Sequence, residues 1–208
     1  EAIKLAFADG QKYITDPLKM KIKTEELLSE AYGEERRRLI NEKASLPMAG
    51  RPSKGGTVYL AAADGEGNMI SFIQSNYMGF GSGLVVPGTG ISLQNRGHNF
   101  SFDINHDNCL EGGKKPYHTI IPGFLTKDNK AVGPFGVMGG FMQPQGHLQV
   151  IMNTIDFNMN PQAALDAPRW HWVKDKKVEI EKSISNEISN SLIELGHEVE
   201  LQQDSGVF

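Results

Sequence analysis

The sequence predicts an α+β fold, and three observations carry that prediction. Strand-like segments follow one another in antiparallel runs separated by tight turns, helical patterns gather in separate runs, and the chain contains no internal repeat. We therefore expect antiparallel sheets that are covered by helices.

The first part of the chain, residues 1–56, is predicted to be helical and then loose. A helical pattern begins at Glu1, and Ser29 is suited to cap a helix that runs through Ala31, Leu39 and Ile40. Residues 45–56 hold two prolines, three glycines and two serines, a composition typical of linkers. A boundary between two parts of the chain is predicted here, after residue 56.

From Thr57 onward strands dominate at first. An antiparallel hairpin is expected from two strands that flank the turn cluster 64–68, and a second pair of strands is expected around the turn Asp128-Asn129. The predicted strands are Thr57–Ala63, Met69–Asn76, Ile91–Asn95, Thr119–Leu125 and Ala131–Met138.

Helices and strands are mixed in the last third of the chain. Pro144 suits the first turn of a helix over Gln143–Ile155, Asn160-Pro161 predicts a short helix, and Ser185 predicts a helix that Gly196 ends. The strands predicted here are Arg169–Trp172, Val178–Glu181 and His197–Leu201. We expect the aromatic segment Arg169–Trp172 to pack beneath the sheet that begins with Thr57 rather than to bind a ligand.

Composition excludes several classes of protein. With 39% hydrophobic and 22% charged residues and a net charge of −4, the chain is typical of a globular protein and has no basic field for nucleic acid. Its one cysteine, Cys109, cannot form an internal disulfide, and we assign it no role. The six histidines lack metal-ligand spacing, so we predict neither a metal nor another cofactor. No apolar run approaches the length of a membrane span.

A glycine-rich stretch, Gly79-Phe80-Gly81-Ser82-Gly83, superficially suggests a loop that cradles phosphate. Loops of that kind need the N-terminus of a following helix, and no helix is predicted after this one. We therefore reject nucleotide binding.

Thr57 opens the first predicted strand directly after Gly55-Gly56 and has two possible roles. It can be an ordinary β-branched residue that starts a strand after a hinge. Alternatively, cleavage of the Gly56–Thr57 bond would free it as an N-terminal nucleophile whose own α-amine acts as the base.

The chain resembles the γ-glutamyltransferase (γ-glutamyltranspeptidase) family, and in particular its cephalosporin-acylase-like branch. The resemblance covers nearly the whole chain, and its ordered set of motifs is more specific than any single one. These motifs are Gly55-Gly56-Thr57, Asp64-Gly65-Glu66-Gly67-Asn68, Gly79 to Gly83, Gly90 to Asn95, Lys114-Lys115-Pro116, Gly139-Gly140, Asn153 to Ile155, and Ala167-Pro168-Arg169.

The resemblance implies an αββα sandwich of the N-terminal-nucleophile hydrolase type, present here in part. It implies that Thr57 attacks an amide carbonyl and that the N–H groups of Gly139 and Gly140 bind the oxyanion. Ser75 would take the place of a second threonine that supports the nucleophile. Residues 1–56 would form the end of the large subunit, and residues 57–208 would form the small, catalytic subunit without its C-terminal end.

Several residues depart from the glutamyl-specific pattern. Tyr77 replaces an asparagine, Arg96 and Asn99 replace the polar residues that hold the substrate's α-amine, and His118-Thr119 replaces a serine pair that contacts the α-carboxylate. An arginine repels an ammonium group but grips a carboxylate. The sequence therefore predicts an acyl pocket that prefers a glutaryl-like or other acidic acyl group, although Arg96 could instead form a structural ion pair with a nearby acid.

We expect a piece of a longer, self-processing amidohydrolase or acyltransferase that acts on γ-glutamyl or similar acidic acyl amides. A glutaryl-type cephalosporin acylase is the alternative within this class, and a non-enzymatic binding or structural relative is the alternative outside it. The expected partners are a small-molecule amide and the large subunit from the same precursor, without nucleic acid. The sequence leaves a cytoplasmic and a secreted location equally open.

Overall fold

The structure is a computed structural model that describes residues 1–46 and 57–203, so the predicted linker lies almost entirely outside the described residues. The chain divides into two compact units. Described residues of the first unit fall in 1–46, 97–118 and 170–203, and those of the second fall in 57–96 and 119–169. Within the described residues the chain therefore passes between the units three times, at Arg96/Gly97, at His118/Thr119 and at Arg169/Trp170.

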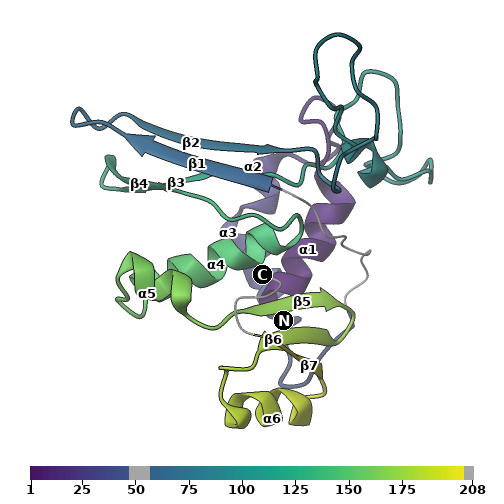
Figure 1. Cartoon of the computed structure of the whole chain (residues 1–208). Coiled ribbons are helices and arrows are strands. Elements are labelled where there is room, and N and C mark those ends of the chain that lie inside the picture. The colour runs from purple at the N-terminus through teal and green to yellow at the C-terminus, as the bar shows by residue number, and fades with distance from the viewer. Residues whose placement is uncertain (47–56, 204–208) are drawn as a thin grey trace. The chain divides into compact units, whose positions relative to one another are not determined.

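The first unit combines helices with a three-stranded sheet (Figure 1). Its helices are α1 (Ala2–Tyr13), α2 (Thr24–Leu27), α3 (Glu30–Arg37) and α6 (Asn186–Glu194), and its strands are β5 (Trp170–Lys174), β6 (Lys177–Glu181) and β7 (Glu198–Gln202). Strand β6 lies between β5, which is antiparallel to it, and β7, which is parallel. The parallel pairing corrects the expectation of antiparallel runs only.

The core of the first unit lies on one face of this sheet. Trp172 pairs with Val178 and Trp170 with Ile180, so these four side chains share a face, and Ile180 is fully buried. The ring of Phe7 on α1 lies 5.7 Å from the ring of Trp172. Trp172 therefore packs against α1 in the core of the first unit, in a sheet other than the one that carries Thr57.

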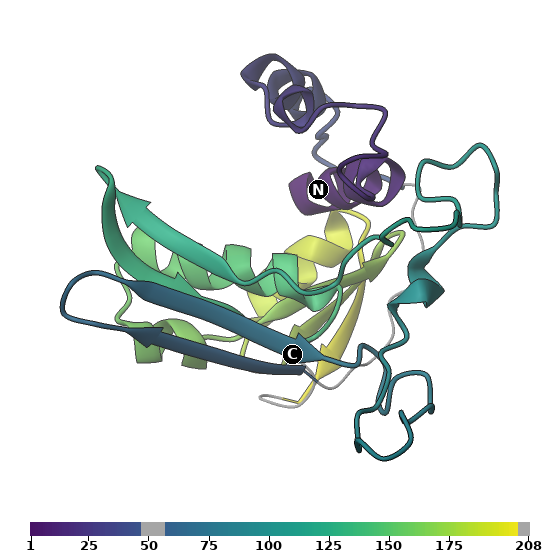
Figure 2. The ribbon, with the colours of Figure 1, turned by 90° about the horizontal axis from the view of Figure 1, so that it is seen from above.

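The second unit is built from two hairpins and two helices. Strands β1 (Thr57–Ala63) and β2 (Met69–Ser75) form one hairpin, and β3 (Gly123–Lys127) and β4 (Lys130–Phe135) form the other. Helices α4 (Met142–Ile155) and α5 (Pro161–Asp166) follow the second hairpin. A short 3₁₀ turn, η1 (Arg96–Asn99), starts at Arg96, the residue at which the stretch 57–96 ends. Figures 1 and 2 show the two hairpins side by side with α4 running alongside.

The predicted helix caps and turns are confirmed. Ser29, Asn160 and Ser185 each accept a hydrogen bond from a backbone N–H in the first turn of the helix that follows. Asp128 and Asn129 both have positive φ, at 50° and 59°, as the tight turn between β3 and β4 requires.

Three predicted element ends differ from the structure by three residues or more, and one predicted strand is absent from the described residues. The helix capped by Ser29 ends at Arg37, before Leu39 and Ile40. The second hairpin begins at Gly123 rather than at Thr119 and ends at Phe135 rather than at Met138. Residues 91–95 form no strand, because only one isolated bridge, Val85 to Ser92, joins this stretch to its neighbour.

Candidate active site

Thr57 and Ser75 lie opposite each other at one end of the first hairpin. Thr57 is the first residue of β1, Ser75 is the last residue of β2, and the two are paired in register. Directly opposed residues of an antiparallel pair point their side chains to the same face of the sheet. The structure thus brings the predicted nucleophile next to its predicted supporting hydroxyl, and it buries Thr57 to 8% exposure.

Tyr77 follows Ser75 closely and has an unusual backbone. Its φ is 76°, a left-handed conformation that is a genuine outlier for a bulky residue. In this conformation its backbone N–H donates to Oγ of Ser75 at 2.8 Å, while its side chain is buried at 3% exposure. The tyrosine main chain therefore fixes one hydrogen bond of the Ser75 hydroxyl.

Arg96 is a buried cation that connects Ser75 to Thr119. Its Nη2 donates to the carbonyl oxygen of Ser75 at 2.9 Å, and its Nε donates to Oγ1 of Thr119 at 3.2 Å. Both Arg96 and Thr119 are 5% exposed.

Burial lowers the pKa of the Arg96 guanidinium, and the nearby Tyr77 phenol partly offsets this effect. Among the residues that the structure describes, no carboxylate forms an ion pair with Arg96. The described chain thus buries this charge with hydrogen bonds but without a counter-ion.

Two candidate residues belong to the first unit. Asn99 donates from Nδ2 to the carbonyl oxygen of Tyr117 at 3.0 Å, and its own carbonyl oxygen accepts from Nδ2 of Asn108 at 2.8 Å. His118 is exposed and precedes Thr119 in the chain. The other seven predicted site residues all belong to the second unit.

Gly139 and Gly140 stand just before α4, and both have positive φ, at 124° and 59°. A Cβ added to Gly139 would lie 2.8 Å from Cβ of Met142, so only glycine fits at this position. The backbone N–H groups of Met142 and Gln143 donate to the carbonyl oxygens of Gly139 and Gly140. The two glycines therefore form the entry to a 14-residue helix, whose N-terminal end favours negative charge.

The first hairpin packs against the end of β4, which lies a few residues before Gly139 and Gly140 in the chain. Oγ of Ser71 lies 3.3 Å from the carbonyl oxygen of Phe135, to which it donates, and 3.0 Å from the hydroxyl of Tyr59. A Cβ on Gly136 would overlap the Tyr59 ring, so the glycine allows a close approach. These contacts join the strand of Thr57 to the segment that leads to Gly139.

One buried residue of this region was not predicted from the sequence. Gln143, in the first turn of α4, is fully buried and accepts from the backbone N–H of Ile121 through Oε1 at 3.1 Å. A glutamine three residues after a Gly-Gly pair, in the first turn of a helix, is the only signal that the sequence offers.

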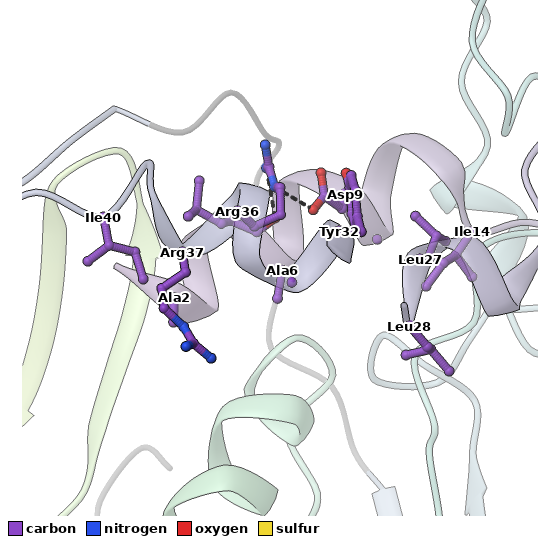
Figure 3. A pocket seen from close by; sticks show the side chains of 13 residues that line it. Ala2, Ala6, Asp9, Ile14, Leu27, Leu28, Tyr32, Arg36, Arg37 and Ile40 are labelled. Carbon is purple, nitrogen blue, oxygen red and sulfur yellow. Dashed lines mark hydrogen bonds and ion pairs between the residues drawn. The ribbon is translucent and has the colours of Figure 1, made fainter. Parts of the chain in front are cut away.

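A separate hollow of about 380 Å³ lies in the first unit, between α1 and the α2–α3 segment (Figure 3). Nε of Arg36 lies 2.8 Å from Oδ2 of Asp9 in this hollow, and burial together with Asp9 raises the pKa of the neighbouring Tyr32. None of the nine predicted site residues lines it. The hollow is therefore distinct from the candidate active site.

Within the described ranges, no three His, Cys, Asp or Glu side chains are grouped as metal ligands would be. No helix among the described residues is both long and apolar enough to cross a membrane.

Comparisons with known proteins agree on one family. A sequence model of the γ-glutamyltranspeptidase family matches residues 1–208. The chain is 37% identical to a glutathione hydrolase-like proenzyme, YwrD, from Bacillus subtilis, and 35% identical to an oxamate amidohydrolase proenzyme from Klebsiella pneumoniae. Each match covers 98% of this chain but 40% of the relative.

A solved structure is similar over almost all of the chain. The crystal structure of a cephalosporin acylase from Bacillus halodurans shares 62% sequence identity and superposes with a TM-score of 0.91. The match covers 99% of this chain and 38% of that one, so the chain spans about two fifths of the length of the relatives it matches. On these grounds the chain belongs to the γ-glutamyltranspeptidase family.

Proposed function

We propose that this chain carries the catalytic residues of a self-processing amidohydrolase or acyltransferase in which Thr57 is the nucleophile. The observation that carries the proposal is the pairing of Thr57 with Ser75, at a buried strand end that also holds Tyr77 and Arg96. Membership of the family and the word "proenzyme" in the names of both relatives support it.

The proposed reaction begins with cleavage of the Gly56–Thr57 bond. Cleavage frees the α-amine of Thr57, which has an ordinary pKa of about 7.7–8.0 and is partly neutral at pH 7. The amine accepts the proton from Oγ1 as this oxygen attacks the amide carbonyl, and the protonated amine then returns a proton to the leaving amine. Water or an amino acceptor releases the acyl group from Thr57 in the second half of the reaction.

Gly139 and Gly140 are proposed to bind the oxyanion. Their backbone N–H groups lie at the N-terminal end of α4, where the helix dipole adds to hydrogen bonding. One donor of this kind contributes about 2.7–4 kcal/mol to transition-state stabilisation.

The proposed architecture is the αββα sandwich, with residues 1–56 at the end of the large subunit and 57–208 in the small subunit. The outer face of the first hairpin supports a further layer, because it is apolar and exposed over Val58, Leu60, Ile70 and Phe72, at 49–69%. Its proposed cover is the remainder of the large subunit, which the greater length of the relatives would supply.

Cleavage can be tested on the full-length protein by intact mass and N-terminal sequencing. The proposal predicts a fragment that begins at Thr57, its loss in Thr57→Ala, and its retention in Thr57→Ser, which keeps a hydroxyl nucleophile. An uncut, folded chain in the unmodified protein would instead favour a non-enzymatic relative.

The proposed substrates are amides of acidic acyl groups. Arg96 supports an acyl group with a carboxylate, because a buried guanidinium without a described counter-ion attracts an anion and repels an ammonium group. A glutaryl-type acylase is therefore the second candidate beside γ-glutamyl transfer, and the 62% identity to a cephalosporin acylase favours it. Tyr77 and Thr119, which belong to the same unit as Arg96, are proposed to complete the acyl pocket. Asn99 and His118 stay predicted substrate-binding residues.

The acyl preference is measurable as the ratio of kcat/KM for glutaryl and γ-glutamyl p-nitroanilides. Arg96→Gln should shift this ratio toward the γ-glutamyl substrate, because the cation that repels the α-ammonium is removed. An unchanged ratio would show that Arg96 does not select the acyl group.

A further inference from the structure

A continuous line of buried hydrogen bonds joins the strand of Ser75 to the glycines before α4. Arg96 links the carbonyl oxygen of Ser75 to Oγ1 of Thr119, as described above. Two residues further along, the N–H of Ile121 donates to Oε1 of Gln143 at 3.1 Å. Gln143 in turn donates from its backbone N–H to the carbonyl oxygen of Gly140 at 3.1 Å.

The three side chains of this line are almost inaccessible to solvent. Arg96 and Thr119 are each 5% exposed, and Gln143 is 0% exposed. When a buried hydrogen bond is broken inside a protein, water cannot replace the lost partner, so each link resists displacement more than a surface bond would.

Stability alone does not explain the amide of Gln143. Its Nε2 is buried and has no hydrogen-bond partner within the described part of the chain. A buried donor without a partner is unfavourable, and an apolar side chain of the same length would avoid that penalty. What the glutamine adds in the described structure is the single bond through Oε1 to Ile121.

We propose that Gln143 is a positioning residue that holds Gly139 and Gly140 in register with Thr57 and Ser75. The inference rests on the proposed function, because it assigns the oxyanion to the two glycines. Gln143 acts through Ile121 and Gly140 and does not contact the substrate. The segment 119–121 is the rigid bridge, since Arg96 fixes one end of it to β2 and Gln143 fixes the other end to α4.

The first test is Gln143→Met in the full-length protein, because methionine keeps the length of the side chain and removes the acceptor. We expect kcat for glutaryl or γ-glutamyl p-nitroanilide to fall about 10- to 100-fold, the usual loss for a small displacement of a catalytic group. The rate is expressed per active site titrated with a covalent inhibitor, so that misfolded protein is not counted. KM should stay within about threefold, because ground-state binding does not depend on the oxyanion.

Gln149→Met is the matched control. Gln149 is also buried on α4, but its Nε2 donates to the carbonyl oxygen of Gln145 within the same helix, at 3.0 Å. This control should lose stability without losing kcat per titrated site. A purely structural role for Gln143 would give the same pattern, and that result would overturn the proposal.

A second pair of variants covers the case in which Gln143→Met does not fold. Thr119→Val removes the hydroxyl that accepts from Arg96, whereas Thr119→Ser keeps it. We expect a lower kcat for the valine variant than for the serine variant, with similar KM values in the two. Because Thr119 is also a proposed acyl-pocket residue, equal kcat values, or a difference confined to KM, would overturn the positioning role.

The positioning role of Gln143 and the proposed function fail in different ways. If Thr57→Ala remains cleaved and active, the proposed function is wrong, and the positioning role of Gln143 is then wrong as well. If Thr57→Ala is inactive while Gln143→Met keeps the kcat of the unmodified protein, only the positioning role of Gln143 is wrong.

Discussion

The backbone N–H of Tyr77 donates to Oγ of Ser75 over 2.8 Å, and it does so from a left-handed conformation that tyrosine rarely adopts. The hydrogen bond occupies one acceptor position of the Ser75 hydroxyl, which as a hydroxyl can also donate one hydrogen bond. Because Thr57 lies opposite Ser75 in the hairpin, this arrangement suits Ser75 as a donor to the Thr57 oxygen.

Loss of the Ser75 hydroxyl should slow the reaction. We expect Ser75→Ala to lower kcat about 10- to 100-fold, which corresponds to the 1.5–3 kcal/mol of a hydrogen bond to a charged group. Ser75→Thr keeps the hydroxyl and should retain most of the activity. Steady-state kinetics on the processed protein measure both variants, and equal losses in the two would argue against a role for the hydroxyl.

Strain at Tyr77 can be measured by comparing two truncations. Tyr77→Ala and Tyr77→Gly both delete the buried ring, but only glycine adopts a φ of 76° without steric cost. The left-handed penalty of about 1–2 kcal/mol exceeds the entropic disadvantage of glycine, about 0.4–1 kcal/mol. Urea unfolding should therefore find Tyr77→Gly more stable than Tyr77→Ala by about 0.5–1 kcal/mol. The reverse order would indicate that the backbone relaxes once the ring is gone.

Gly139 should not tolerate a side chain. Gly139→Ala places a Cβ against Met142 at a positive φ, so we expect the entry to α4 to shift and kcat to fall by at least about 100-fold. Gly65→Ala is the control, since a Cβ there meets nothing within 4 Å and the residue lies in the first hairpin's turn. The expectation is checked by kinetics together with the thermal midpoint of both variants; similar kcat values would contradict it.

His147 should make the fold sensitive to acid. Burial lowers the pKa of its imidazole below the ordinary value of 6.5, and its ring packs edge-on against Phe135 with centroids 5.0 Å apart. A lowered pKa in the folded state means that the unfolded chain binds the proton more readily. The contribution to stability is therefore complete above pH 6.5 and decreases as the pH falls toward the folded-state pKa.

Replacement by a residue that does not titrate removes this sensitivity. Unfolding free energies of His147→Gln and of the unmodified protein, measured between pH 8 and pH 4, should converge as the pH falls. Parallel curves would show that His147 does not contribute to the pH dependence.

Local chemistry explains why much of the fold is predictable from sequence. The first hairpin follows from Asp64, whose Oδ1 accepts from the N–H groups of Glu66 and Asn68, both at 2.9 Å, to close the turn. Asn160 likewise determines the start of α5 with its own side chain, which accepts from Ala163. Each of these features depends on residues that are close together in the chain.

The failed predictions depend on non-local pairing or on backbone strain. Residues 91–95 have strand-like side chains, but Gly88 and Gly90 before them adopt positive φ, and only one bridge forms. Residues 119–122 are held by Arg96 and Gln143 rather than by a neighbouring strand.

For the candidate site, the sequence predicted a set of residues but not the hydrogen bonds that connect them. The pairing of Thr57 with Ser75 follows from the predicted hairpin, whereas the left-handed Tyr77 and the buried amide of Gln143 required coordinates.

The division of the chain into two interleaved units has a consequence for its synthesis. Every described residue of the unit that carries Thr57, Arg96 and Gly139 is synthesised before Trp170. Helix α1, by contrast, must wait for Trp172 and the rest of its sheet, because the ring of Phe7 packs there. Contacts between distant parts of a chain form late, so the second unit can fold while α1 still lacks its partners in the first unit. The second unit can thus complete its contacts before the first unit does, although the first unit begins earlier in the described chain.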